Sequence, residues 1–277
     1  MTQRTIVITG ASDGIGAAAA RRLSGMGDRL VLVGRSEAKT AAVARPLGAS
    51  YLFADFTRLD EVRALAEQLR AACPRIDVLV NNAGGIMGER EITVDGFEKT
   101  LQVDHLASFL LTNLLMDTLV ASAAKIINTS SIAARRFGHI DIDDLGNARD
   151  YSPEKAYGDS KLANILFAKE LHRRYHSRGI VTAAFHPGNV ATNFAADSTS
   201  MMRFIYQTPL KYLALISPDR GADTLVWLVN GTPGSDWISG SYYERRRPAK
   251  TNPQADDVTL ARELWDRSAE MVGLATA

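Results

Sequence analysis

The chain has 277 residues, of which 46% are hydrophobic and 23% are charged, and its formal net charge is +1. This composition is that of an ordinary globular protein, and a charge so close to zero argues against nucleic acid or an acidic membrane surface as a partner. The single cysteine, Cys73, excludes an internal disulfide framework and a cysteine-based metal cluster, and we expect no metal site.

The amino-terminal residues lead directly into a short apolar run over 5–9, without the long apolar region of a signal peptide. The most apolar stretch, 204–229, is interrupted by Lys211, Asp219, Arg220 and Asp223. A membrane span needs about 20 apolar residues in succession. We therefore expect a cytoplasmic protein without a membrane span.

Short apolar runs alternate along the chain with longer stretches of helical periodicity. The runs predict strands over 5–9, 29–33, 50–53, 77–80, 125–129, 180–185 and 240–243. The helical stretches lie near 14–26, 37–46, 59–72, 95–120, 154–176, 219–230 and 256–272. Strands without polar alternation, separated by helices, indicate one Rossmann-type α/β domain over 1–277, with a doubly wound parallel sheet and helices on both faces. The apolar segment 193–215 interrupts this pattern and predicts a substrate lid or a pair of surface helices.

The first strand is followed by the glycine-rich stretch from Thr9 to Gly16, TGASDGIG. Glycines in a strand-to-helix turn allow a tight turn and a close approach of the backbone to phosphate. The amino terminus of the following helix offers free N–H groups and the positive end of its dipole. This turn predicts nucleotide binding, with the candidate residues Gly10, Ser12, Asp13, Gly14, Ile15 and Gly16.

The second predicted strand is followed by Gly34, Arg35 and Ser36. NAD-binding sites usually place an acidic residue here, which contacts the ribose 2′-hydroxyl. The guanidinium of Arg35 is instead suited to a 2′-phosphate, although Asp13 opposes it if the two approach the same group. We therefore predict that NADP(H) is favoured over NAD(H), with Arg35 and Ser36 among the contacts.

Further candidate residues follow the third, fourth and fifth predicted strands, at the edge of the sheet that faces a cofactor. Asp55 and Phe56 follow the third strand, and Asn82, Ala83 and Gly84 follow the fourth. Ser130 and Ser131 follow the fifth strand, where a hydroxyl can donate a hydrogen bond to a carbonyl oxygen as its charge changes.

Tyr157 and Lys161 are four residues apart in a stretch of helical composition. Side chains at positions i and i+4 share one face of a helix. A phenol with an unperturbed pKa near 10 is a poor acid or base at neutral pH, and a nearby cation favours the phenolate. The pair therefore predicts a general acid/base.

The motifs TGASDGIG, NNAG, NTSS, YGDSK and HPGNVAT, in this order, resemble the short-chain dehydrogenase/reductase family over nearly the whole chain, from residue 5 to about 274. The runs FEKTLQVDHLASFLLTNLL, YGDSKLANILFAKEL and ISGSYY, and the long stretch from Ser131 to Tyr157, resemble its retinol dehydrogenase-like subgroup, which includes the WW-domain oxidoreductases.

The resemblance implies that Tyr157 donates a proton to the substrate carbonyl during reduction and accepts it during oxidation. Lys161 then makes the phenol a better acid and binds the nicotinamide ribose, and Ser131 polarises the carbonyl. Further implied cofactor contacts are Asp55 to the adenine, Asn82, Ala83 and Gly84 beside the adenine ribose, and Pro187, Gly188, Val190 and Thr192 at the nicotinamide amide.

One position departs from the family pattern, because Asp104-His105 stands where the subgroup usually has Asn-His. In the family this Asn helps to hold a water molecule linked to the catalytic lysine. Aspartate has a similar shape but lacks the amide donor and adds a charge. We therefore expect activity with a shifted pH profile, and add Asp104 to the candidate catalytic residues Ser131, Tyr157 and Lys161.

These features together predict an NADP(H)-dependent oxidoreductase that interconverts an aldehyde or ketone and an alcohol. The small-molecule substrate is expected to be apolar or amphipathic. Two alternatives remain: reduction of an activated C=C bond or of a sugar or polyketide intermediate, and an interaction protein that senses NADP without turnover. The resemblance also allows a homodimer, which would form through the helices predicted over 95–120 and 154–176.

Overall fold

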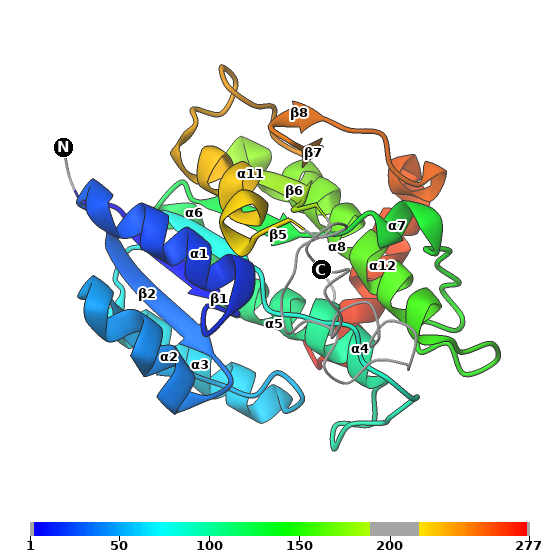
Figure 1. Ribbon diagram of the computed structural model, residues 1–277. Coiled ribbons are helices and arrows are strands. Elements are labelled where there is room, and N and C mark those ends of the chain that lie inside the picture. The colour runs from blue at the N-terminus through cyan, green and yellow to red at the C-terminus, as the bar shows by residue number, and fades with distance from the viewer. Residues whose placement is uncertain (1–2, 189–215, 276–277) are drawn as a thin grey trace.

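The computed structural model describes residues 3–188 and 216–275. Within these residues eight strands form one sheet in the order β3-β2-β1-β4-β5-β6-β7-β8 (Figure 1). All neighbouring pairs are parallel except the last, in which β8 runs antiparallel to β7. The strands are β1 (Thr5–Thr9), β2 (Arg29–Gly34), β3 (Ser50–Phe53), β4 (Val78–Asn81), β5 (Lys125–Thr129), β6 (Val181–His186), β7 (Ser241–Glu244) and β8 (Arg247–Pro248).

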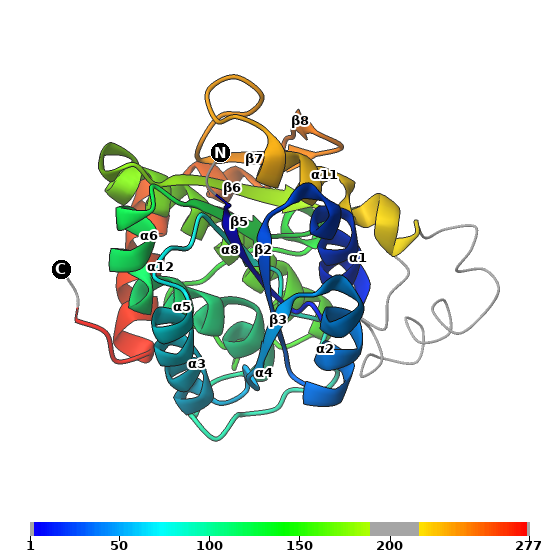
Figure 2. The ribbon, with the colours of Figure 1, turned by 90° about the vertical axis from the view of Figure 1, so that its left-hand side faces the viewer.

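Helices cover both faces of the sheet, which confirms the predicted doubly wound α/β fold (Figure 2). One face carries α1 (Gly14–Leu23), α2 (Glu37–Ala44) and α11 (Pro218–Asn230). The other carries α3 (Leu59–Ala72), α5 (Ala107–Leu114) and α8 (Pro153–Tyr175). Successive residues of β1 belong to opposite core layers, since Ile6 and Ile8 pack with α1 and α11 whereas Val7 packs with α3 and α5. This burial on both sides explains why the strand sequences show no polar alternation.

A further helix, α12 (Val258–Met271), packs on the outer side of α8. Its Trp265 and Ala269 join the core layer that α5 and α8 form with the sheet. The shorter helices are α4 (Lys99–Leu101), α6 (Met116–Ala121) and α7 (Ala133–Arg136), and short 3-10 turns cover 24–26, 45–47, 176–178 and 253–256.

The single helix predicted over 95–120 is wrong in detail, because the structure divides this stretch. The buried carboxylate of Glu98 accepts hydrogen bonds from the N–H groups of Thr100 and Leu101, so the helix begins only after Glu98. A π-helical turn follows at Gln102–Leu106, which the bond from Ala107 N–H to the Gln102 carbonyl closes. Such turns insert one residue into a helix and frequently occur at functional sites.

The strand β8 is also absent from the prediction. Arg245 and Arg246 have φ values of +50° and +62°, and this turn reverses the chain so that Arg247 pairs with Glu244. The helices among the described residues include none that is long and apolar enough to cross a membrane. The predicted lid at 193–215, together with Val190 and Thr192, lies outside the described residues.

The strand order reverses between β1 and β4. From β1 the chain continues to β2 and β3 on one side of the sheet, and from β4 it continues to β5 and β6 on the other side. Ligands of open α/β sheets bind outside the carboxyl ends of the strands at such a reversal. The carboxyl ends of β1 and β4 are followed by the glycine-rich turn and by Asn82, Ala83 and Gly84.

Candidate active site

The glycine-rich turn packs directly against the end of β4. A Cβ atom at Gly10 would lie 2.7 Å from the Cα atom of Ala83, and one at Gly16 would lie 2.4 Å from the Gly10 carbonyl oxygen. Gly10 also has a φ of +64°, which favours glycine. Asp13 then begins α1, and its carboxylate accepts the Gly14 N–H at 2.7 Å. The turn thus brings the amino terminus of α1 to the switch point, where a pyrophosphate would fit.

Thr9 joins the ends of β1 and β4, although sequence reasoning did not include it among the site residues. Its hydroxyl donates to the Val80 carbonyl at 3.1 Å and accepts the N–H groups of Asn82 and Ala83 at 3.0 and 3.1 Å. The amide of Asn82 in turn donates to the Thr9 carbonyl and accepts the hydroxyl of Thr129 at the end of β5. Asn82 therefore links three strand ends.

Arg35 is exposed immediately after β2, next to the glycine-rich turn. Ala11 N–H donates to the Val33 carbonyl at 2.9 Å, and a Cβ atom at Gly34 would lie 2.9 Å from the Ser12 Cβ atom. Ser36 caps α2 by accepting the Lys39 N–H. An exposed residue with a cationic side chain thus follows the end of β2, which packs against the glycine-rich turn.

Asp55 and Phe56, the two candidate residues that follow β3, differ in burial. The Asp55 carboxylate accepts the Thr57 N–H at 3.0 Å, and its own N–H donates to Glu61. The Phe56 side chain is only 5% exposed and packs in the apolar core. Phe56 can therefore contribute little more than its backbone to a cofactor contact.

Tyr157 and Lys161 lie on α8, which begins at Ser152 and Pro153. The Ser152 hydroxyl accepts the Lys155 N–H, and proline at the first helical position loses no backbone hydrogen bond. The Lys161 ammonium lies 5.3 Å from the centroid of the Tyr157 ring. The helical spacing therefore brings the cation and the phenol together as the sequence predicts.

The end of β5 is fixed to α8 by Ser130 rather than by Ser131. The Ser130 hydroxyl is buried and donates to the Lys161 carbonyl at 2.7 Å, whereas Ser131 is half-buried and its hydroxyl accepts the Ala133 N–H. The chain after α7 approaches α8 closely at Gly158, where a Cβ atom would lie 2.8 Å from the Gly138 nitrogen. This packing holds the Ser131 turn against the helix that carries Tyr157.

Asp104 forms a buried ion pair with Lys161. Its Oδ2 atom lies 2.9 Å from the lysine Nζ atom, and the two side chains are 0% and 2% exposed. Its Oδ1 atom accepts the Gly85 N–H at 2.8 Å, and the Ser160 hydroxyl lies 3.3 Å from Oδ2. Burial raises the pKa of the Asp104 carboxyl, while the Lys161 charge and these hydrogen bonds oppose that rise.

The neighbouring His105 extends this buried polar network to α12. Its Nδ1 atom lies 3.2 Å from Asn164 Oδ1 and its Nε2 atom 3.0 Å from the Ser268 hydroxyl. The Asn164 amide nitrogen donates to the carbonyls of Asp104 and Thr129. Because the Asn164 oxygen is an acceptor, Nδ1 carries the proton of a neutral His105, whose pKa burial lowers to about 4.

His186, at the end of β6, is a second site residue that sequence reasoning missed. Its Nδ1 atom accepts the N–H groups of Ile132 and Gly188, each at 3.3 Å. It thereby connects the residue after Ser131 with the Pro187-Gly188 segment. Burial lowers its pKa to about 4, which keeps the ring neutral and able to accept these bonds. The sequence signals for it are its position between a predicted strand and Pro187 and its place as the first residue of the HPGNVAT motif.

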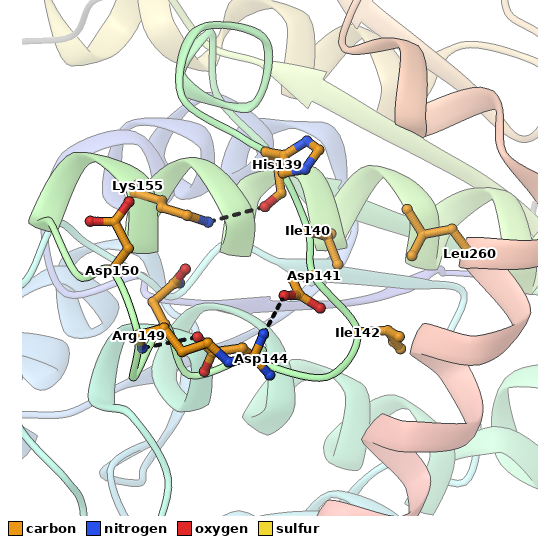
Figure 3. A pocket seen from close by; sticks show the side chains of 10 residues that line it. His139, Ile140, Asp141, Ile142, Asp144, Arg149, Asp150, Lys155 and Leu260 are labelled. Carbon is orange, nitrogen blue, oxygen red and sulfur yellow. Dashed lines mark hydrogen bonds and ion pairs between the residues drawn. The ribbon is translucent and has the colours of Figure 1, made fainter.

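A pocket of about 390 Å³ opens elsewhere, between the chain before α8 and the beginning of α12 (Figure 3). Arg149 pairs with Asp141 at 3.1 Å along its edge, and the Lys155 ammonium donates to the His139 carbonyl. Exposed ion pairs of this kind contribute little stability. None of the described candidate catalytic or cofactor residues lines this pocket, which is formed by His139, Ile140, Asp141, Ile142, Asp144, Asn147, Arg149, Asp150, Lys155 and Leu260.

Comparison with known proteins identifies the family of this chain. The family described as "short chain dehydrogenase" matches residues 4–203. The "Putative daunorubicin C-13 ketoreductase DnrU" of Streptomyces sp. (strain C5) is 43% identical over 98% of this chain and 93% of its own length. Human retinol dehydrogenase 13 is 37% identical over 98% of this chain and 85% of its own length.

Two solved structures share the fold. A crystal structure of an uncharacterized protein from Mycobacterium paratuberculosis covers 100% of this chain and 96% of its own, with a TM-score of 0.79 and 32% identity. The Pseudomonas aeruginosa RhlG/NADP active-site complex covers 87% of this chain and 94% of its own, with a TM-score of 0.69 and 26% identity. The chain therefore belongs to the short-chain dehydrogenase family of NAD(P)-dependent oxidoreductases.

Proposed function

We propose that this oxidoreductase uses NADP(H) to interconvert an aldehyde or ketone and the corresponding alcohol, with Tyr157 as the general acid/base. The observation that carries the proposal is the position of Tyr157 and Lys161 on α8, against the turn that holds Ser131. The description of the 43% identical relative as a ketoreductase supports a carbonyl substrate. The names of the retinol dehydrogenases support an apolar alcohol or aldehyde.

The residues of this chain would supply placement and proton transfer. A bound reduced nicotinamide supplies the hydride that the carbonyl carbon accepts. The Ser131 hydroxyl donates a hydrogen bond to the carbonyl oxygen, and the Tyr157 hydroxyl gives that oxygen its proton. The C=O double bond thereby becomes a C–O single bond with one new C–H and one new O–H bond. Oxidation of the alcohol reverses each transfer.

The preference for NADP(H) rests on Arg35. Its exposed guanidinium follows β2 beside the glycine-rich turn, where it can form charge-assisted bonds to a 2′-phosphate. The solved complex of RhlG with NADP is consistent with this preference. We expect Arg35→Ala to weaken NADPH binding far more than NADH binding.

The first test measures oxidation of NADPH, and of NADH, with a panel of apolar aldehydes, ketones and quinones. We expect turnover with NADPH, and we expect Tyr157→Phe to abolish it because the ring keeps its packing but loses the proton. Tyr175→Phe is the matched control, since Tyr175 ends the same helix and packs beside Trp265. Tight NADPH binding without turnover of any panel member would instead support a cofactor-sensing protein.

A further inference from the structure

We propose that Asp104 neutralises the charge of Lys161 and thereby keeps Tyr157 protonated through neutral pH, which sets the pH range in which the site reduces carbonyl groups. This inference rests on the proposed function, because it assigns Tyr157 the proton that reduction consumes. Asp104 acts through Lys161 and is therefore a positioning residue.

The first step is the placement of the two charges. The Asp104 carboxylate is 2.9 Å from the Lys161 ammonium, and neither side chain is reached by solvent. Water would screen such a pair at the surface, but a buried pair is screened much less. A cation alone near the phenol favours the phenolate. A cation with an anion in contact acts as a dipole, whose field at the phenol is far weaker.

The second step is that the carboxylate is held in this position by the backbone. The Gly85 N–H binds Oδ1, which directs Oδ2 toward Lys161. Gly84 leaves room for the contact, because a Cβ atom there would lie 2.6 Å from Asp104 Oδ1 and 2.8 Å from Lys161 Nζ. The π-helical turn at Gln102–Leu106 places Asp104 in this position. Three separate segments therefore converge on the ion pair.

The third step concerns the other groups around Asp104. His105, its neighbour, is neutral at physiological pH because burial lowers its pKa to about 4. Glu98 is buried nearby and its carboxylate accepts the N–H groups of Thr100 and Leu101. Among the charged side chains of the described residues around Asp104, Lys161 is the cation in contact with it. The negative charge of Asp104 thus balances the positive charge of Lys161.

The Asp104–Lys161 pair affects how the rates of reduction and oxidation depend on pH. It does not change the equilibrium of the reaction. Reduction needs the Tyr157 hydroxyl, so its rate stays high until the phenol ionises at alkaline pH. Oxidation needs the phenolate, so its rate rises until the same pH. Replacing Asp104 with asparagine restores a net charge on Lys161 and moves both transitions toward neutral pH, by about 1–2 pH units.

The experiment compares the wild type with Asp104→Asn in two measurements. The first is the near-ultraviolet absorbance of phenolate in the protein without cofactor, with the Tyr157 contribution identified by subtracting the titration of Tyr157→Phe. The second is kcat/KM for reduction and oxidation as a function of pH. We expect the Tyr157 step and both rate transitions to move together toward lower pH in Asp104→Asn.

Asp159→Asn is the matched control. Asp159 is a buried acid on the same helix and pairs with Lys155 at 2.6 Å, away from Lys161. We expect its titration step and rate profile to stay close to those of the wild type. Equal shifts in Asp159→Asn and Asp104→Asn would overturn the proposal, since any lost negative charge would then suffice.

The absorbance measurement separates this proposal from the proposed function. An Asp104→Asn protein that folds and binds NADPH, with the Tyr157 step unmoved, would overturn the role of Asp104 even if turnover is found. A shifted step without turnover on any substrate would retain the role of Asp104 and refute the proposed reaction. If Asp104→Asn does not fold, the wild type decides: ionisation of Tyr157 near neutral pH would overturn the proposal.

Discussion

Gly84 is the residue on which the Asp104–Lys161 contact depends most directly. Its φ is +152°, and the space that a side chain would need is filled by the two charged groups. We expect Gly84→Ala to lower the free energy of unfolding by about 1–3 kcal/mol and to reduce kcat, since alanine must displace Asp104 or Lys161. Urea unfolding and steady-state kinetics would measure the two effects.

Gly25→Ala provides the comparison for Gly84→Ala. A Cβ atom at Gly25 would meet nothing within 4 Å, and its φ is negative. Alanine there should be neutral or stabilise slightly, because it restricts the unfolded chain. If Gly84→Ala proved as stable and as active as Gly25→Ala, the close packing around Asp104 would have no functional importance.

Site residues differed in how readily the sequence indicated them. Tyr157 and Lys161 are related by one helical turn, so their contact follows from spacing alone. Asp104 and Lys161 are far apart in the chain, and only the tertiary structure shows that they form a direct ion pair. Thr9 and His186 open two of the motifs that the sequence shows, TGASDGIG and HPGNVAT, but only the structure reveals that they bind backbone N–H groups of other strand ends.

At the scale of elements, the sequence predicts best the helices whose buried apolar residues recur at helical spacing. The prediction for 59–72 matches α3 residue for residue, and α8 begins at the proline that follows its cap. The sequence predicts one helix over 95–120 because its apolar residues follow helical periodicity. Its division depends on the cap that the buried Glu98 carboxylate forms and on the backbone hydrogen bonds of the π-helical turn, which the spacing of apolar residues does not indicate.

The helix α12 stabilises the site by covering α5 and α8. Trp265 is 8% exposed, and its ring lies 5.0 Å from that of Phe109 and 5.7 Å from that of Phe167. The Arg174 guanidinium lies 4.7 Å from the Trp265 ring. We expect Trp265→Ala to lower the free energy of unfolding by about 3–5 kcal/mol, as measured in urea, because it leaves a cavity in a buried aromatic cluster.

This cluster also bears on assembly. A homodimer through α5 and α8 would require α12 to move, so we expect the wild type to sediment as a monomer and Trp265→Ala to self-associate more readily. Val258→Ala is the control on the same helix, because Val258 is exposed and its loss should cost little. A wild-type dimer that Trp265→Ala leaves intact would show that pairing uses another surface.

At the scale of the whole molecule, buried ionisable groups couple stability to pH in two opposite directions. His105 and His186 have pKa values lowered to about 4 by burial, whereas an unfolded histidine has a pKa near 6.5. The unfolded chain therefore binds protons first as the pH falls, which favours unfolding between about pH 6.5 and 4. Burial raises the pKa of Glu98, Asp104 and Asp159, so these groups favour the folded state as the pH falls.

The buried histidines and the buried acids have opposite effects on the free energy of unfolding as the pH falls. The contribution of the histidines is therefore best measured as a difference between variants. Each buried histidine should lower the free energy of unfolding by about 1.4 kcal/mol per pH unit across its window. His186→Gln keeps an acceptor for the Ile132 and Gly188 N–H groups but cannot be protonated, so we expect urea unfolding to show a pH slope smaller by that amount. His139→Gln, at an exposed position, should keep the wild-type slope. Equal slopes for His186→Gln and the wild type would mean that His186 is already protonated in the folded protein, and its Nδ1 atom could then accept neither N–H group.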